Sequence, residues 1–315
     1  MEVTAIGESM VSLINEPSGY IRHADGFKPF VAGAETNTLI GLARLGHQTS
    51  WISALGDDEL GELILHKVRA EGIDTSHVLL KNKRTGVFFK QISPDGSVDV
   101  TYYRENSAAS SLGIDDIDLE AIRRTKVLYL TGITLSLSQS ARDMLFEVVR
   151  QLGDEVKVVF DPNIRLKMWS ASEARETILE FIPYVDCLIV GKSEVDILLE
   201  TNDYRQALDT FKEMGCHKTV LKLGRDGAVY DIDGDRGEVR NPRQFEEIDP
   251  VGAGDAFAAG IVSGLLNEEK AGTLVEKACF LGGYITQFVG DYQGFPSAEM
   301  LRTAMDKSSD EKVNR

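Results

Sequence analysis

The sequence predicts an α/β protein with a doubly wound, largely parallel sheet flanked by helices and a small antiparallel β lid. Three observations support this fold class. Short apolar runs rich in β-branched residues recur along the chain, and stretches with helical spacing separate them. Two further stretches lack helical spacing altogether and read as alternating strands.

Six apolar runs are predicted to form the strands of the main sheet. Each is apolar almost throughout, as expected of parallel strands that are covered on both faces, and most are followed by glycine or by polar residues. These strands are expected at 3–6, 50–55, 127–131, 156–160, 187–190 and 219–223.

Helices are predicted between these strands. Residues 35–45 place leucines on one helical face, and Gly46 ends that helix. The next helix begins after Asp57 and Asp58, which both offer a carboxylate to cap it, and ends at Gly72. Further helices are expected at 140–151 and 204–214.

The two stretches without helical spacing are 11–32 and 86–104. The second reads as two strands joined by a turn at Pro94-Asp95-Gly96. Because the stretches share this character, we expect them to pair into one small sheet that covers a ligand as a lid. The expected division is a lid of 11–32 and 86–104 on a core of 1–10, 33–85 and 105–315.

Charge and composition exclude several kinds of partner. The 315 residues include 34 lysines and arginines against 50 aspartates and glutamates, which gives a formal net charge of −16. Such a field opposes nucleic acid and anionic membranes. The first residues carry acid where a signal peptide carries base, and no apolar run is long enough to span a membrane, so we expect a cytoplasmic protein.

Cysteine and histidine give no sign of a metal or redox centre. The three cysteines are far apart and form no Cys-x-x-Cys pair, so buried thiols are the simplest interpretation. The five histidines show no metal-ligand spacing. The residues concerned are Cys187, Cys216, Cys279, His23, His47, His66, His77 and His217.

The segment from Asp249 to Gly260 carries the clearest chemical signal. Gly252, Ala253 and Gly254 open a helix of small residues, so their backbone amides can surround an anion. Asp255 lies in the same first turn and could accept a proton from a hydroxyl nucleophile, as phosphoryl transfer to an alcohol requires. The alternative is a glycine-rich helix start that Asp255 merely caps, which many folds contain.

Other nucleotide-binding motifs are absent. Gly191-Lys192-Ser193 fails as a Walker A loop, because Asp186 stands where that motif needs glycine. No Gly-x-Gly-x-x-Gly and no protein-kinase His-Arg-Asp or Asp-Phe-Gly motif occurs. These gaps disfavour a dinucleotide-dependent dehydrogenase and a protein kinase.

Over nearly its whole length the chain resembles the ribokinase or PfkB family of carbohydrate kinases. Two motifs carry the resemblance: Gly33-Ala34-Glu35-Thr36-Asn37 followed by GLARLG, and Asp249-Pro-Val-Gly-Ala-Gly-Asp255. The resemblance implies ATP as donor, Mg²⁺, Asp255 as catalytic base and the amides of Gly252, Ala253, Gly254 and Asp255 as the anion hole. It further implies a nucleotide loop with Lys222, Gly224 and Gly227, acceptor contacts from Gly33 and Asn37, and a homodimer, or a higher oligomer, built through the lid.

Within the family the chain is most similar to kinases of a sugar acid, 2-keto-3-deoxygluconate. The similarity lies in Tyr102-Tyr103-Arg104, Gly132-Ile133-Thr134, Asp161-Pro-Asn-Ile-Arg165 and Gly290-Asp291. It implies that Arg104 and Arg165 bind the acid's carboxylate through charge-assisted hydrogen bonds, with Tyr102, Ile133 and Asp291 also at the acceptor. Alternatively, Arg104 faces solvent and Arg165 forms a structural salt bridge.

Some positions depart from the family pattern. Gly191-Lys-Ser-Glu194 replaces a common Asn-x-x-Glu, so Glu194 is expected to organise the metal through water and Lys192 to neutralise nucleotide phosphate. Pro250 stands where many relatives have threonine, which weakens the expectation of a monovalent cation near Asp249. Phe88 or Phe89 replaces an expected tyrosine.

Two rival functions remain open at this level. A fructokinase or another neutral-sugar kinase would use the same machinery without a carboxylate contact. A catalytically silent sugar-binding protein would not need Asp255, so the intact motif argues against it.

Overall fold

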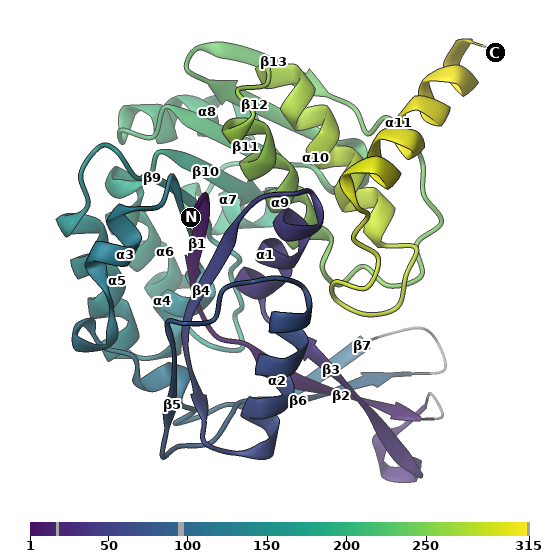
Figure 1. Ribbon diagram of the computed structural model, residues 1–315. Helices are drawn as coiled ribbons and strands as arrows, with labels where there is room; N and C mark the ends of the chain where they lie inside the picture. Colours follow the sequence, from purple (N-terminus) through teal and green to yellow (C-terminus); the bar gives the residue numbers. More distant parts are fainter. Residues whose placement is uncertain (17–18, 94–97, 314–315) are drawn as a thin grey trace.

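The computed structural model describes residues 1–16, 19–93 and 98–313 and, for 307–313, the backbone only. A nine-stranded sheet crosses the centre of the protein in the order β13-β12-β11-β10-β9-β8-β1-β4-β5 (Figure 1). All neighbours from β11 to β5 are parallel, and β12 and β13 are added antiparallel. The doubly wound, largely parallel sheet predicted from the sequence is therefore confirmed. Its strands are β1 (Val3–Ile6), β4 (Thr49–Gly56), β5 (Val78–Lys81), β8 (Val127–Thr131), β9 (Lys157–Asp161), β10 (Cys187–Gly191), β11 (Lys218–Lys222), β12 (Ala228–Ile232) and β13 (Asp235–Val239).

Helices cover both faces of this sheet because its strands are apolar on both sides. Alternate residues of β8 enter different cores: Tyr129 packs into one cluster, and Leu128 and Leu130 into the other. The first core is shared with α1 (Ala34–Arg44), α2 (Glu59–Ala70), α9 (Ala253–Leu266), α10 (Ala271–Ile285) and α11 (Ala298–Val313). The second is shared with α3 (Leu119–Arg123), α4 (Gly132–Leu137), α5 (Gln139–Gln151), α6 (Ala171–Phe181), α7 (Lys192–Leu199) and α8 (Tyr204–Glu213). Short 3-10 helices lie at Ile21–His23, Ala109–Ser111, Ile114–Asp116, Ile182–Tyr184 and Gly224–Asp226.

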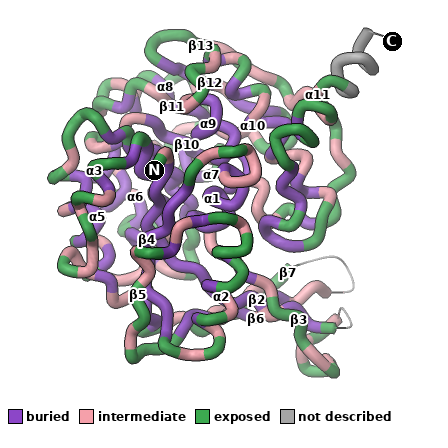
Figure 2. The backbone as a smooth tube through the Cα atoms, in the orientation of Figure 1, coloured by how far each residue is buried: buried purple, intermediate pink, exposed green. Residues whose placement is uncertain are grey.

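Local sequence signals set the ends of the helices. The Asp58 carboxylate accepts a hydrogen bond of 2.8 Å from the amide of Gly61 and so caps α2, as expected. Helix α9, like α1, is buried along most of its length, which Figure 2 shows in purple. Its run of small residues permits this burial: a Cβ on Gly260 would lie 2.6 Å from the Cα of Ala278 in α10.

A four-stranded sheet in the order β3-β2-β6-β7 projects from one side of the main sheet (Figure 1). The two stretches expected to pair do so, and both outer strand pairs are antiparallel. The central pair, β2 with β6, is parallel, which the long connection through the core between the two hairpins permits. The turn expected at Pro94-Asp95-Gly96 lies outside the described residues. The strands are β2 (Met10–Glu16), β3 (Gly26–Ala32), β6 (Val87–Ile92) and β7 (Val98–Tyr103).

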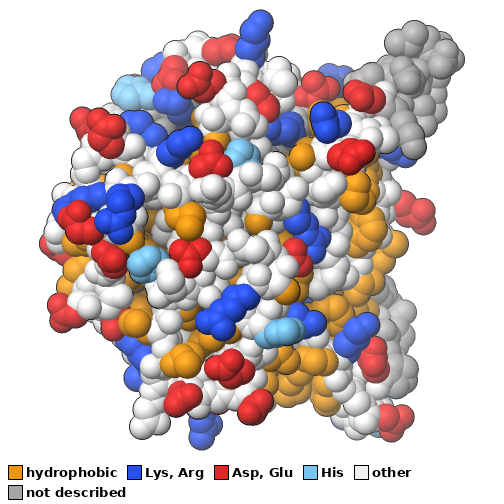
Figure 3. Space-filling view, in the orientation of Figure 1, with side chains coloured by type: hydrophobic (Ala, Val, Ile, Leu, Met, Phe, Trp, Pro, Cys, Tyr) orange, Lys and Arg blue, Asp and Glu red, His pale blue; other side chains and the backbone are white. Residues whose placement is uncertain are grey.

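The surface agrees with the charge composition. In the view of Figure 3, acidic and basic side chains are interspersed, and hydrophobic side chains are exposed over and beside the small sheet at the lower right. Of the helices that the structure describes, none is long and apolar enough to cross a membrane.

Candidate active site

The predicted acceptor residues line one cavity of about 520 Å³. It lies beyond the carboxyl ends of β9, β10 and β11, where ligands bind in doubly wound sheets, and the inner face of the small sheet covers it. All eight residues expected at the acceptor contribute to its wall: Gly33, Asn37, Tyr102, Arg104, Ile133, Arg165, Asp255 and Asp291. We call this space the acceptor cavity.

Asp255 lies in the first turn of α9 and is 8% exposed. Asn37, in the first turn of α1, donates a hydrogen bond of 2.8 Å from its Nδ2 to Oδ2 of Asp255. Burial raises the pKa of Asp255 to about 8, and the charges of Asp161 and Asp291 act in the same direction. The carboxyl group is thus tuned to gain or lose a proton near neutral pH, as a general base requires.

The start of α9 presents backbone amides to the acceptor cavity. Gly252 has φ +83°, and a Cβ there would lie 2.0 Å from the carbonyl oxygen of Asp291, so only glycine fits. Throughout the described residues, no acceptor faces the amides of Gly252 and Gly254, whereas the amide of Ala253 donates to the carbonyl of Pro250 at 3.3 Å. The amides of Gly252 and Gly254, two of those expected in the anion hole, are thus open.

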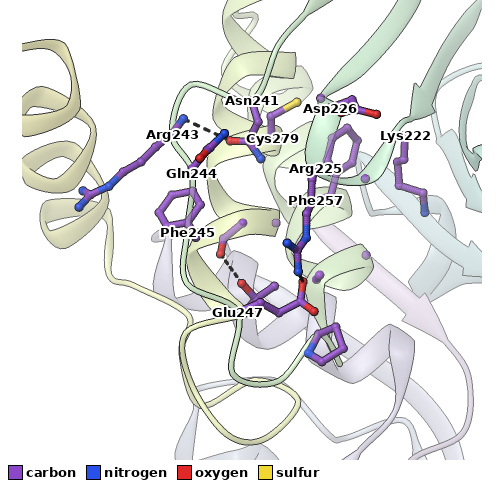
Figure 4. Close-up of a pocket in the computed structure, with 18 residues that line it drawn as sticks. Lys222, Arg225, Asp226, Asn241, Arg243, Gln244, Phe245, Glu247, Phe257 and Cys279 are labelled. Atoms are coloured by element: carbon purple, nitrogen blue, oxygen red, sulfur yellow. Dashed lines mark hydrogen bonds and ion pairs between the residues drawn. The ribbon is translucent and has the colours of Figure 1, made fainter. Parts of the chain in front are cut away.

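A second cavity, of about 480 Å³, holds the predicted nucleotide loop. Figure 4 shows it with Phe245 and Lys222 on opposite sides and an ion pair of 3.0 Å between Arg225 and Glu247 at its edge. Gly224, Gly227, Ala253 and Gly254 also line it. Gly224 (φ +64°) and Gly227 (φ +113°) have backbone conformations that favour glycine. We call this space the nucleotide cavity.

Lys222 lies between the two cavities and lines both. Its Nζ is 2.7 Å from Oδ2 of Asp161, at the end of β9. Burial lowers the pKa of Lys222, but Asp161 and Glu194 outweigh that effect and raise it, so the side chain stays cationic. Lys192 is exposed and lines neither of these two cavities, but it borders a shallow depression together with Lys222 and Gly224, which line the nucleotide cavity.

Glu194 has a structural role that the sequence did not indicate. Its two carboxylate oxygens accept hydrogen bonds from the amides of Ile164 at 2.8 Å and of Gly191 at 2.5 Å, so it joins the end of β10 to the loop after β9. Burial raises its pKa. The described part of the chain has no group of three or more His, Cys, Asp or Glu side chains that could hold a metal ion. Mg²⁺ bound mainly by phosphate and water, with one or two carboxylates nearby, fits these residues.

The two arginines differ in their surroundings. Arg104 is nine-tenths buried and forms an ion pair with Glu8, so it does not face solvent. Ser107 donates to the same Glu8 carboxylate at 2.5 Å. Arg165 lines the cavity but is exposed, and the one hydrogen bond of its guanidinium within the described chain goes to the carbonyl of Ile164 at 3.3 Å. Within the described chain Arg165 forms no ion pair, although its charge acts on Asp255 and lowers the pKa of that carboxyl group.

Sequence reasoning missed two charged residues of the acceptor cavity, Glu8 and Lys90. Glu8 follows the first strand, where we expected polar residues in general without a role for this one. Lys90 reads as a solvent-facing position on a strand, yet it is 1% exposed and paired with Asp249 at 2.7 Å. The signal that was available is the alternation of side chains along a strand: Lys90, two residues after Phe88, must lie on the same face of the small sheet as Phe88.

Comparison with known proteins identifies the family. Residues 1–298 match the model of the pfkB family carbohydrate kinases, and the chain belongs to this family. A 2-dehydro-3-deoxygluconokinase of Bacillus subtilis is 32% identical over 96% of this chain and 94% of that relative. A 2-dehydro-3-deoxygluconokinase of Thermoproteus tenax is 33% identical over 97% of this chain and 95% of that relative. A crystal structure of an Escherichia coli protein described as a putative ribokinase II, in complex with ATP and Mg²⁺, has a TM-score of 0.89 at 24% identity and covers 97% of this chain and 99% of that chain. The resemblance inferred from the two sequence motifs is confirmed: this protein is a carbohydrate kinase.

Proposed function

We propose that this kinase transfers the γ-phosphoryl group of ATP to the terminal hydroxyl of 2-keto-3-deoxygluconate, also called 2-dehydro-3-deoxygluconate. The observation that carries the proposal is the pair Arg104 and Arg165 in the cavity that also contains Asp255. A sugar acid has a carboxylate that these guanidinium groups can bind at one end, while its terminal hydroxyl reaches Asp255 at the other. The names of the two relatives support the same acceptor.

In this mechanism Asp255 accepts the proton of the attacking hydroxyl. Asn37 fixes the carboxylate by its 2.8 Å hydrogen bond and favours the ionised form. The amides of Gly252 and Gly254 lie where charge develops on the transferring group, and Lys222 adds a positive charge between donor and acceptor. Mg²⁺ bound with ATP supplies further neutralisation of the phosphates, and Glu194 is the carboxylate that could orient its water shell.

The remaining acceptor contacts follow from the cavity wall. Tyr102 packs against Arg104, whose guanidinium carbon lies 5.5 Å from the ring centroid, so the ring holds the arginine over the acceptor. Ile133 gives an apolar wall, and Gly33 lets the backbone approach closely. Asp291, whose pKa burial raises to about 6, is placed to accept from a sugar hydroxyl.

For the nucleotide, we assign ATP to the nucleotide cavity. Gly224 and Gly227 allow the chain to approach the adenosine or its phosphates, and Phe245 offers an aromatic face. Lys192, beside Lys222 and Gly224, then lies near the phosphates. At Asp249 we propose that no monovalent cation is needed, because the Lys90 ammonium already pairs with this carboxylate.

The small sheet is proposed to act as both lid and dimer interface, with the domain division expected from the sequence. Its inner face carries Phe88 and Tyr102 over the acceptor cavity. Its outer face carries Phe27, Phe89 and Tyr103, whose rings pack edge to face. Exposed aromatic side chains of this kind are typical of a surface that another copy covers. A cytoplasmic location stays a prediction from the sequence.

A neutral-sugar kinase is the second candidate, and one observation favours it. Because Glu8 offsets the charge of Arg104, only Arg165 remains to attract a carboxylate, and a ketose could use Arg104 through its hydroxyls. A coupled assay of ADP release against 2-keto-3-deoxygluconate, fructose, ribose and a nucleoside decides. The proposal requires the highest kcat/KM for the sugar acid. Higher kcat/KM for fructose would establish the rival, and binding without turnover of any acceptor would indicate a silent protein.

A further inference from the structure

Lys90 is a buried charge that the proposed chemistry does not use. It belongs to β6 of the small sheet, and its side chain is 1% exposed. Fully buried lysines are rare unless they are paired, because the ammonium loses its hydration. The side chain points to the inner face, where it lines the acceptor cavity.

The partner of Lys90 is the residue that shapes the loop before α9. Asp249 receives Nζ of Lys90 at 2.7 Å on Oδ2. The same oxygen accepts from the amide of Gly290 at 3.1 Å, and Oδ1 accepts from the amide of Val251 at 3.2 Å. One carboxylate therefore ties three segments together: the small sheet, the loop that enters α9 and the segment around Gly290.

These three segments meet at the anion hole. The carbonyl of Asp291, next to Gly290, lies against Gly252, where a Cβ would be only 2.0 Å away. The backbone of Gly252 therefore packs directly against the 290–291 segment, and a shift of that segment toward Gly252 is blocked. A displacement of β6 that carries Lys90 along must shift or break the contact at Asp249, and so disturb the amides that would hold the phosphoryl group.

We propose that Lys90 is a positioning residue that couples the small sheet to the anion hole. An acceptor held beneath the small sheet keeps Lys90 on Asp249 and orders the start of α9, and an ordered start binds nucleotide phosphate more tightly. Coupling of this kind is reciprocal, so the nucleotide also tightens the acceptor. The inference rests on the proposed function for the identity of the two ligands, but the link itself is a property of the chain without ligand.

The test needs a variant that removes the link without leaving a buried charge. Lys90→Met alone strands the Asp249 carboxylate, which is strongly destabilising, so the double variant Lys90→Met/Asp249→Asn is used. Lys28→Met is the matched control, because Lys28 is an exposed lysine of β3 in the same sheet. Circular dichroism and thermal melting establish that both variants fold.

The ligand-free proteins are compared first by hydrogen–deuterium exchange. Because Asp249→Asn itself alters residues 248–256, the double variant is compared with Asp249→Asn alone, which keeps a side-chain oxygen to accept from Lys90. Loss of the link should speed exchange in residues 248–256 at least threefold relative to Asp249→Asn, and Lys28→Met should leave these residues unchanged. Unchanged exchange in the double variant would overturn the proposal. This result does not depend on the acceptor, so it stands even if 2-keto-3-deoxygluconate proves to be the wrong substrate.

Ligand coupling is then measured by calorimetry with a non-hydrolysable ATP analogue, with and without saturating 2-keto-3-deoxygluconate. The wild type should bind the analogue at least fivefold more tightly when the sugar acid is present, and this factor should fall below twofold in the double variant. A merely structural role for Lys90 would lower thermal stability and leave the factor intact, which contradicts the proposal. If the double variant does not fold, hydrogen–deuterium exchange of the wild type is measured with and without 2-keto-3-deoxygluconate. The coupling requires that the sugar acid slow exchange in residues 87–92 and in residues 248–256. Slower exchange in residues 87–92 alone would overturn it.

Discussion

Asn37 and Asp255 are joined by a 2.8 Å hydrogen bond although 218 residues separate them in the chain. The bond connects the first turn of α1 to the first turn of α9, two helices that pack together on one face of the main sheet. It brings the two family motifs of the sequence into a single contact. Because the Asn37 amide donates to the ionised carboxylate, it counteracts the burial that raises the pKa of Asp255.

Activity should depend on pH through Asp255. The general base must be ionised, and the pKa of this carboxyl is about 8, so kcat/KM for the acceptor should rise with pH and level off above about 8. Asn37→Ala should move the midpoint to higher pH, because the bond it removes lowers the pKa. Initial rates between about pH 6 and 10 measure both midpoints. Coincident midpoints for the two proteins would show that Asn37 does not act on the base.

Asp255→Asn should lower kcat by about 10²–10⁴-fold and yet stabilise the ligand-free protein at high pH. The folded-state pKa, about 8, lies above the ordinary value of 3.8, so the ionised carboxylate destabilises the fold. This cost is absent below about pH 4 and grows until about pH 8. The melting temperatures of the two proteins should therefore separate as the pH rises from about 4 to about 8. Near pH 8 the Asp255→Asn variant should melt at least about 2 °C above the wild type. A difference in melting temperature that is the same at about pH 4 and at about pH 8 would contradict a raised pKa for Asp255.

Gly252→Ala should abolish activity and destabilise the protein strongly. Gly72→Ala should destabilise the protein less and leave activity largely intact. The two glycines have nearly the same backbone angle, φ +83° and +82°. A Cβ on Gly72 meets nothing within 4 Å, so alanine there costs only the strain of the left-handed conformation, about 1–2 kcal/mol. At Gly252 the carbonyl of Asp291 must also move. Urea unfolding and kcat compare the pair, and equal effects would mean that the contact with Asp291 is not needed.

Much of the fold could be predicted because the main sheet follows local rules. All six strands expected from apolar runs are present, and the cap at Asp58 is where the sequence places it. The β12–β13 hairpin was missed, although Asp233-Gly234, with φ of +54° and +89°, carries the turn signal for it. The parallel pairing of β2 with β6 could not be predicted, since nothing local fixes how two separate hairpins meet.

Site residues that belong to a family motif could be predicted from the sequence. Charged residues whose ion-pair partner lies far away in the sequence could not. The acceptor cavity contains every residue that the family resemblance suggested for the acceptor. The ion pairs of Lys90 with Asp249 and of Arg104 with Glu8 form only after the small sheet has folded over the core. A charged residue on an alternating strand normally faces water, so the sequence alone favours the wrong side for Lys90.

Arg165→Ala should raise KM for 2-keto-3-deoxygluconate by about 10–100-fold and have much less effect on fructose, because a charge-assisted hydrogen bond contributes about 1.5–3 kcal/mol. Arg104→Ala should impair both substrates, since it also leaves Glu8 buried without its partner. Arg175→Ala is the control, because Arg175 is a partly exposed arginine of α6 that pairs with Glu200. Equal losses for the acid and for fructose in Arg165→Ala would exclude a carboxylate contact there.

The outer face of the small sheet should hold two copies together. Tyr103 is 65% exposed and Phe27 38% exposed, and both rings contact Phe89 at centroid distances of 5.6 and 5.2 Å. An aspartate at the centre of such an interface would be buried without a partner, so Tyr103→Asp should convert a dimer of twice 34.7 kDa into monomers in light scattering. Met300→Asp, at an exposed apolar residue of α11, should leave the mass unchanged. Because the inner face of the same sheet covers the acceptor cavity, monomers should also show a raised KM for the acceptor. A monomeric variant with an unaltered KM would show that dimer formation does not affect how the small sheet covers the acceptor.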